Sequence, residues 1–228
     1  MKLHNRSPKV WILALGVLIG NLYCPAGAQQ TPTAAVACNF VGRFYLNPTT
    51  FQGQVIGYFT NIHGIFNGMS DPLFNGDGTP FFTFRSDLFS LKPLPVNGNL
   101  ALPANSDLAL FLVSAGQFNI FFNPTPNCDW NNPDTFSNGQ LIAHFTRPEV
   151  LDLQFESTSQ HIITETLVSS LSFMFKGKTF NFSEIAPGGI TLYEAISNTP
   201  LPGVATFSIV LPFAGTGVAV SNQGEGQD

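Results

Sequence analysis

The stretch Leu151-Asp152-Leu153-Gln154-Phe155-Glu156 alternates apolar and polar side chains at every position. Because successive side chains of a β-strand point to opposite faces, this alternation predicts a strand with one face buried and the other in water. The segment 205–211 repeats the pattern. Phe118, Ile120 and Phe122 share one face of a third predicted strand. Half-buried strands of this kind are typical of antiparallel sheets.

Three further segments are predicted to be extended. Residues 173–175 and 180–182 flank Lys176-Gly177-Lys178-Thr179, which predicts a β-hairpin with its glycine at a positive φ. Residues 108–113 are apolar on both faces, so we expect them at the centre of a sheet. Residues 162–171 are the one segment with a helical pattern, but their β-branched and Ser content favours a strand.

Phenylalanine dominates the composition. All 23 phenylalanines lie after residue 28, among many Gly, Pro, Asn, Thr and Val residues. This mixture favours strands and turns over helices, and turn signals recur between the short apolar segments. The chain is therefore predicted to be all-β, with a single antiparallel β-sandwich or closed β-barrel over residues 37–220.

The first 28 residues have the organisation of an export signal. Basic residues precede an apolar run over residues 10–23, and Ala26-Gly27-Ala28 supplies the small residues required for cleavage. The run is about 14 residues long and falls short of the roughly 20 that span a bilayer as a helix. We therefore expect a signal peptide that is removed from the mature protein.

Cleavage after Ala28 sets the expected organisation: a flexible N-terminus at 29–36, the all-β domain at 37–220 and a disordered tail at 221–228. The mature chain would carry six basic and fourteen acidic residues. This balance opposes binding to nucleic acid or anionic lipid headgroups, since both are bound through Lys and Arg. The expected location is secreted or extracytoplasmic, in a periplasm or at a cell surface, without a transmembrane segment in the mature chain.

Cys38 and Cys128 are the cysteines that remain after the predicted cleavage, because Cys24 lies within the signal. An even pair in an oxidising compartment is typical of a disulfide. Closing a loop of about 90 residues would contribute about 4.5 kcal/mol through chain entropy. We predict that the two are bonded and that Trp130 covers the bond, the alternatives being two free buried thiols and a sugar-stacking Trp130.

Two acidic loops are candidate calcium sites, and no other cofactor is expected. Calcium takes six to eight oxygen ligands, and short loops rich in Asp, Asn and Gly present several of them. Neither loop has EF-hand spacing, and the same residues populate turns because their side chains bond to nearby backbone. The candidate ligands are Asp71, Asn75 and Asp77 in the first loop and Asp129, Asn131 and Asp134 in the second.

Residues 47–60 and 132–146 are similar in sequence, with nine identities in fourteen aligned positions once Asn138 is treated as an insertion. Each copy predicts a turn followed by a strand. The match reflects either duplication of a small β unit or the biased use of Asn, Pro, Gly, Thr and Phe. Tyr58 and His144 occupy equivalent positions and are candidate pocket residues, the alternative being polar tips at a sheet surface.

No catalytic motif is present. The chain lacks the Gly-x-Ser-x-Gly elbow of many hydrolases and the His-Glu-x-x-His zinc motif. His63 and His161, like His144, have no companion pattern and are expected at surface or cross-strand positions. Asp152, Glu156 and Glu165 are available for glycoside hydrolysis, which requires two carboxyl groups about 5–10 Å apart in space. Solvated charge on a polar strand face is the alternative for the first two.

The predicted function is a secreted or surface-associated β protein without catalysis, in a binding or structural role. Its working surface would be a cavity for a small apolar ligand or an aromatic patch for an extracellular protein partner. The alternative is a secreted carboxylate- or calcium-dependent enzyme, such as a glycoside-active hydrolase. A pocket with converging Asp, Glu or His side chains and shifted pKa values would favour the enzyme.

Overall fold

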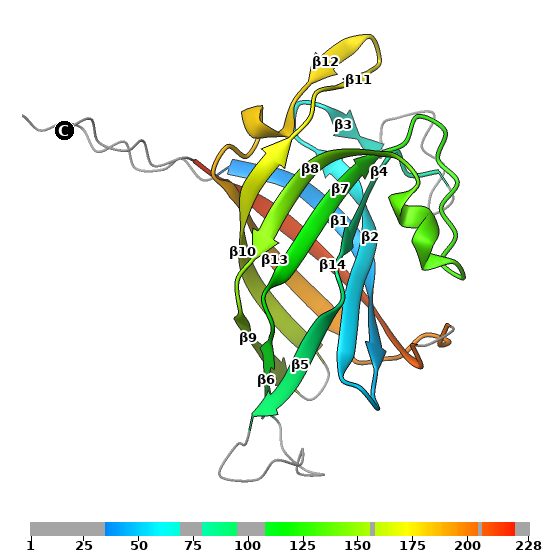
Figure 1. Ribbon diagram of the computed structural model, residues 1–228, viewed down its shortest axis with the longest axis vertical. Coiled ribbons are helices and arrows are strands. Elements are labelled where there is room, and N and C mark those ends of the chain that lie inside the picture. Colours follow the sequence, from blue (N-terminus) through cyan, green and yellow to red (C-terminus); the bar gives the residue numbers. More distant parts are fainter. Residues whose placement is uncertain (1–34, 69–78, 95–107, 156–157, 205–206, 222–228) are drawn as a thin grey trace, which may run out of the picture. The chain divides into compact units, whose positions relative to one another are not determined.

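Eight antiparallel strands close into a barrel (Figure 1). A computed structural model describes residues 35–68, 79–94, 108–155, 158–204 and 207–221. The strands are β1 (Ala35–Asn47), β2 (Gln52–Ile62), β3 (Phe66–Asn67), β4 (Phe82–Ser86), β5 (Phe89–Leu94), β6 (Leu108–Val113), β7 (Gly116–Phe122), β8 (Gln140–Arg147), β9 (Val150–Phe155), β10 (Thr158–Ser170), β11 (Phe173–Phe175), β12 (Lys178–Phe180), β13 (Gly189–Ser197) and β14 (Ile209–Val220). The short 3₁₀ helices are η3 (Pro133–Ser137) and η4 (Phe182–Glu184).

The wall closes because β1 pairs with β14 on one side and with β2 on the other. Around the barrel the order is β1, β14, β13, β10, β8, β7, β4 and β2, and then β1 again. The predicted all-β class is therefore confirmed, and of the two predicted architectures the chain adopts the barrel. Closure pairs the strand edges that an open sheet would leave exposed.

Short breaks divide the long strands on one side of the barrel. Residues 87–88 separate β4 from β5, residues 114–115 separate β6 from β7, and residues 148–149 separate β8 from β9. Above the breaks, β4, β7 and β8 fill the wall between β2 and β10. Below the breaks, β5, β6 and β9 fill the same span. The span between β2 and β10 is therefore filled by strands on both sides of the breaks, and the wall stays continuous.

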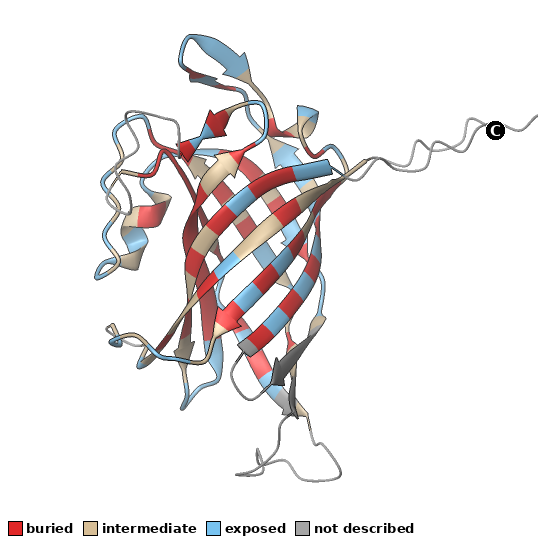
Figure 2. Ribbon diagram, turned by 180° about the vertical axis from the view of Figure 1, so that it is seen from behind, coloured by how far each residue is buried: buried red, intermediate tan, exposed pale blue. Residues whose placement is uncertain are grey.

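Alternation along the strands separates the inner and outer faces of the wall, as Figure 2 shows by the succession of buried and exposed residues. Phe118, Ile120 and Phe122 share one face of β7, as predicted, and this face points into the barrel. The predicted hairpin forms between β11 and β12, with Gly177 at a φ of 75°. Residues 162–170 lie in β10, so the choice of strand over helix is confirmed.

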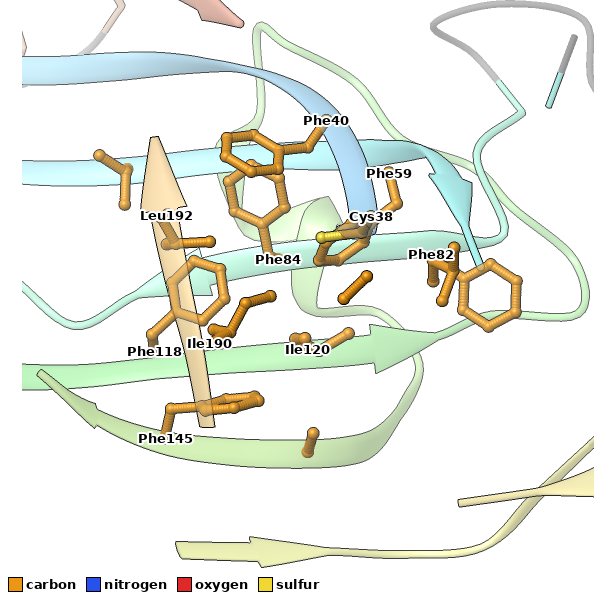
Figure 3. Close-up of a cluster of buried hydrophobic side chains, with 14 of the residues drawn as sticks. Cys38, Phe40, Phe59, Phe82, Phe84, Phe118, Ile120, Phe145, Ile190 and Leu192 are labelled. Atoms are coloured by element: carbon orange, nitrogen blue, oxygen red, sulfur yellow. The ribbon is translucent and has the colours of Figure 1, made fainter. Parts of the chain in front are cut away.

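Phenylalanine rings fill the interior of the barrel (Figure 3). Phe84, which is 1% exposed, lies among four other rings. Its centroid is 5.6 Å from Phe40, 5.3 Å from Phe59 and 5.3 Å from Phe118. A fourth ring, that of Phe213, lies 6.2 Å away. Edge-to-face and tilted contacts at these distances stabilise beyond the burial of area alone.

Glycines on the inner face of the wall make room for these rings. A Cβ atom at Gly57 would lie 2.2 Å from the carbonyl oxygen of Val41 and 2.4 Å from Cζ of Phe84. A Cβ atom at Gly215 would lie 2.5 Å from the ring of Phe40. Large and small residues thus alternate across the interior, which is how a narrow barrel is packed.

The variant Gly57→Ala is expected to lose about 1–3 kcal/mol of folding free energy, since the added methyl overlaps both backbone and ring atoms. Urea unfolding followed by circular dichroism measures the loss. Gly64→Ala is a control for the clash, because nothing lies within 4 Å of a Cβ there, although its φ of +75° adds backbone strain. A Gly57→Ala variant as stable as the parent would contradict this account of the packing.

A second apolar cluster lies on the outer side of the wall. Tyr45, Ile56 and Tyr58 point outward from β1 and β2 and pack against Phe136 of η3. The Trp130 ring lies 4.4 Å from that of Phe136. We call these residues and their neighbours the outer cluster; its remaining members are Val41, Cys128, Leu201, Val204, Phe207 and Val210.

The strand predicted over residues 205–211 begins later than its alternation indicated. β14 starts at Ile209, and residues 205–206 lie outside the described part. Val204 and Phe207 instead form an isolated bridge, and the ring of Phe207 lies 5.8 Å from Tyr45. Phe207 is therefore apolar because it packs in the outer cluster, and not because it lies in a strand.

The predicted disulfide is not formed, because Cys38 and Cys128 are both free. Cys38 lies in the barrel interior, whereas Cys128 packs in the outer cluster. The wall of the barrel separates the two sulfur atoms. Burial raises the pKa of Cys38 to about 12 and that of Cys128 to about 11, so both remain protonated thiols at neutral pH. Trp130 therefore has no disulfide to cover, and its ring packs against those of Phe136 and Tyr58.

The predictions made for the two ends of the chain concern residues that the structure does not describe. Residues 1–34 and 222–228 lie outside the described part, so the export signal, the flexible N-terminus and the tail remain predictions. In the described ranges, neither of the short helices approaches the length or the apolar content that crossing a bilayer demands.

Candidate functional site

A cluster of ionisable side chains lies inside the barrel. Arg147 projects inward from β8, His161 and Glu165 from β10, and Glu194 from β13. Their exposed fractions are 4%, 8%, 1% and 5% respectively. Charged side chains are rarely buried to this extent unless they are paired or functional. We call these four residues the charge cluster.

The strand registers bring the charge cluster together. His161 lies directly opposite Glu194 in the β10–β13 ladder. The β8–β10 ladder ends with Thr146 opposite Thr166, so the next residue on each strand is Arg147 or Glu165. Because the three strands are consecutive in the wall, the four side chains enter the same part of the interior.

Two sets of contacts hold the charge cluster. The Nδ1 atom of His161 lies 3.7 Å from Oε2 of Glu194. Arg147 donates a hydrogen bond of 3.3 Å from Nη2 to the carbonyl oxygen of Ser114, and its guanidinium lies 4.3 Å from the centroid of the Phe89 ring. Within the described residues, Arg147 Nε and Glu165 Oε2 are buried without a hydrogen-bond partner. Such atoms are expensive to bury unless a ligand or water satisfies them.

Burial controls the protonation of Glu165. Desolvation raises the pKa of Glu165 to about 8, with Arg147 opposing the rise and Glu194 adding to it. Burial also lowers the pKa of Arg147, against the attraction of Glu165 and Glu194. Guanidinium remains protonated at all accessible pH values. At neutral pH the site therefore presents a cation beside a carboxylic acid that can donate a hydrogen bond.

The stability of the protein is expected to fall as pH rises from about 4.5 towards 8. The Glu165 carboxyl ionises near 4.5 in the unfolded chain and near 8 in the folded one. Its contribution to stability is therefore complete below pH 4.5 and is lost as pH rises to 8, with a slope of at most about 1.4 kcal/mol per pH unit.

Urea unfolding at pH 5 and pH 8 measures this effect in the parent chain and in Glu165→Gln. The amide cannot ionise, so the variant lacks this component of the slope and the difference between the two proteins isolates Glu165. Parallel stability profiles for the two proteins would show that Glu165 titrates normally.

The charge cluster borders a small cavity of about 20 Å³. A single water molecule needs roughly 10–15 Å³ on this scale, so the cavity accommodates about one water. Anything larger requires a lining side chain to move. The apolar lining residues are Phe44, Val55, Phe89, Leu91, Val113, Phe118, Ile163 and Leu192.

A second hollow, of about 300 Å³, lies at the surface beside the start of β1. Its lining includes His63 and Glu184, which are the ionisable side chains there, together with apolar residues such as Val36 and Ile185. It has the larger volume but no buried cluster of charges. The charge cluster is therefore the stronger candidate site.

The predicted pocket residues Tyr58 and His144 are not brought together. Tyr58 belongs to the outer cluster, and Nδ1 of His144 lies 2.8 Å from Oδ1 of Asn119 on β7. Strands β4 and β7 lie between β2 and β8, which places the two residues about 14 Å apart across the sheet. Each residue therefore has its own contacts, on a different part of the wall.

In the one predicted calcium loop that the structure describes, two of the candidate ligands have protein partners. The carboxylate of Asp129 accepts the backbone N–H of Asn131 at 2.8 Å, and Asp134 pairs with Arg85 at 2.6 Å. Across the described ranges, no three His, Cys, Asp or Glu side chains gather so as to hold a metal. The other loop, with Asp71, Asn75 and Asp77, lies outside the described residues.

Of the carboxylates considered for glycoside chemistry, Glu165 alone is part of the charge cluster. Glu156 lies outside the described residues, and Asp152 lies on β9 opposite Phe111. No motif in the sequence singles out Arg147 or Glu194, and His161 was expected at a surface or cross-strand position. A signal for Glu194 was available, because it falls in phase with the inward-facing Ile190, Leu192 and Ile196.

Comparison with known protein families, with curated proteins and with solved structures gave no match. The roles of the residues in the charge cluster are therefore inferred from their geometry alone.

Proposed function

We propose that this chain is an exported β-barrel protein that binds a small aromatic or aliphatic carboxylate at the charge cluster. The single observation that carries the proposal is the buried pair of Arg147 and Glu165 beside a cavity. Export is supported by the organisation of residues 1–28. A mainly apolar ligand is less favoured, because Phe rings occupy the interior that it would need.

Energetics support a functional role for the charge cluster. Burying an ion costs several kcal/mol, and well-packed apolar residues of similar volume usually stabilise a core at least as well. A barrel with a purely structural role would therefore be served as well by Leu or Phe at these positions. The polar atoms of Arg147 and Glu165 that lack partners are suited instead to meet a ligand.

The chemistry of the donors favours a carboxylate. Arginine presents a planar set of N–H donors that matches a carboxylate, and protonated Glu165 adds an O–H donor. The apolar lining of the cavity would contact the body of the ligand. Phe89 lies over the guanidinium of Arg147, so its ring is the side chain whose movement would make room.

Benzoate, the simplest aromatic carboxylate, is the probe for this proposal. Phe89→Ala removes the ring that occupies the space over Arg147, so benzoate is expected to raise the thermal unfolding midpoint of this variant more than that of the parent. At about 100 times Kd the gain corresponds to about 2.7 kcal/mol. Benzamide, which has the same ring without the charge, should give a smaller gain.

Matched arginine variants complete the test. In the Phe89→Ala background, isothermal titration below the unfolding temperature should show benzoate binding lost when Arg147→Met is added and retained when Arg85→Met is added, because Arg85 lies in an outer ion pair with Asp134. Equal binding by both variants, or no binding by Phe89→Ala, would refute the proposed site.

A second candidate function is acid–base catalysis on the bound molecule. It is favoured by Glu165, whose pKa of about 8 keeps it in the acid form required of a general acid near neutral pH. Mass spectrometry of small carboxylic and carbonyl compounds incubated with the protein distinguishes the two. Products formed by the parent but not by Glu165→Gln support an enzyme, and unchanged compounds support a binding protein.

A further inference from the structure

Charged side chains are absent from the outer face of three neighbouring strands. The Asp, Glu, His, Lys and Arg residues of β10 and β13 are His161, Glu165 and Glu194, and all three point into the barrel. β14 contains no charged residue. This distribution inverts the usual one, in which charged side chains occupy the surface.

The strand registers define this face. Along β10 the outward positions continue from Gln160 to Val168. The residues that face outward in adjacent positions on β10, β13 and β14 form the rows Ile162-Tyr193-Thr216, Thr164-Thr191-Val218 and Gln160-Ala195-Ala214. We call these rows, together with Thr166 and Val168 of β10, the uncharged face.

Large apolar side chains stand out from the uncharged face. Ile162 is 66% exposed, Val168 is 56% exposed and Tyr193 is 45% exposed. Ile162 and Tyr193 lie opposite each other in the β10–β13 ladder, at the middle of the face. Neighbouring exposed apolar side chains such as Ile162 and Tyr193 are typical of interaction surfaces.

We propose that two copies of this chain associate through their uncharged faces. The predicted mature protein has fourteen acidic and six basic residues, so most orientations of two copies repel each other. A face without charges brings no like charges together and has no ions to desolvate. The cores of homodimer interfaces are likewise depleted of charge and enriched in Tyr.

The area of the uncharged face fits a weak dimer. The three rows cover about 14 by 20 Å, and Thr166 and Val168 lengthen the face along β10 to about 30 Å, which gives roughly 350 Å² in projection. Side chains project from the wall, so two faces bury on the order of 1,000 Å², near the lower limit for a specific association. A two-fold axis would place Tyr193 of one copy near Ile162 of the other. The expected dissociation constant is on the order of micromolar.

Sedimentation velocity of the protein obtained from the full chain tests the proposal. Between about 1 µM and about 500 µM the mass is expected to double, and Ile162→Lys or Thr164→Lys should remain monomeric throughout. Leu88→Lys is the matched control: Leu88 is 54% exposed, and it lies next to β4, four strands away from β13. This variant should dimerise like the parent. All three substitutions are at exposed positions and should leave the unfolding midpoint unchanged.

Three results would overturn the proposal. The first is a parent protein that is monomeric at about 500 µM, well above the expected constant. The second is dimerisation of Ile162→Lys and Thr164→Lys at the strength of the parent. The third is binding of the monomer to phosphatidylcholine vesicles that both substitutions abolish, which would assign the face to lipid. The benzoate response is a separate measurement, so the two proposals fail independently.

Discussion

Phe84→Ala is expected to lower the free energy of unfolding by about 3–5 kcal/mol. The ring is 1% exposed and packs against the rings of Phe40, Phe59, Phe118 and Phe213. Because these neighbours are held by a closed wall, they cannot collapse into the space that the ring leaves. The loss therefore combines the transfer of the ring to water with a residual cavity.

Urea unfolding measures the loss, and Phe51→Ala is the control. Phe51 is 41% exposed in the turn between β1 and β2, so its substitution should cost less than about 1 kcal/mol. Phe84→Leu, which fills part of the space, should fall between the two. A Phe84→Ala variant that loses no more than Phe51→Ala would mean that the rings do not form a close-packed core.

Much of the wall was predictable because its signal is local. The alternation over residues 151–156 corresponds to β9, and the apolar run 108–113 corresponds to β6. Closure was not predictable in the same way. It depends on the pairing of Ala35 with Ala219, which lie at opposite ends of the domain, and no local pattern distinguishes this pairing from an open sheet.

The disulfide was wrongly predicted because an even number of cysteines does not show on which side of the barrel wall each cysteine lies. Cys38 and Cys128 are an even pair, but one points into the barrel and the other lies in the outer cluster. The face of Cys38 follows from its place in β1, but Cys128 lies in the loop after β7, whose folding over β2 is a tertiary contact. Local reasoning therefore could not show that the wall separates them.

The charge cluster was missed because its polar residues interrupt apolar rows. Glu194 is in phase with the inward-facing residues of β13, and Arg147 is in phase with Phe145 on β8. On β10 both faces mix polar and apolar residues, since Ile162 faces out while Glu165 faces in beside Ile163. A polar residue in an apolar row is the available signal, but its partners are identified only when three strands are aligned.

Arg147→Met is expected to destabilise the protein by about 3–5 kcal/mol near pH 10, well above the pKa of about 8 of Glu165, because removal of the guanidinium leaves the ionised carboxylate buried without its cation. Arg147 is 4% exposed, and it lowers the pKa of Glu165 by its charge. Below pH 5 the deficit should shrink, because Glu165 can remain protonated at no cost. Urea unfolding at the two pH values measures both quantities.

Removing the carboxyl groups as well should restore much of the stability that Arg147→Met loses. In Arg147→Met with Glu165→Leu and Glu194→Leu, the interior gains apolar side chains and no longer buries a carboxylate. The carboxylate 3.7 Å from Nδ1 of His161 is then also removed. This triple variant should be more stable than Arg147→Met alone and should not bind benzoate. A variant that regains stability but does not bind benzoate is expected if the charge cluster binds a ligand. A triple variant less stable than Arg147→Met would show that the cluster is needed for the fold itself.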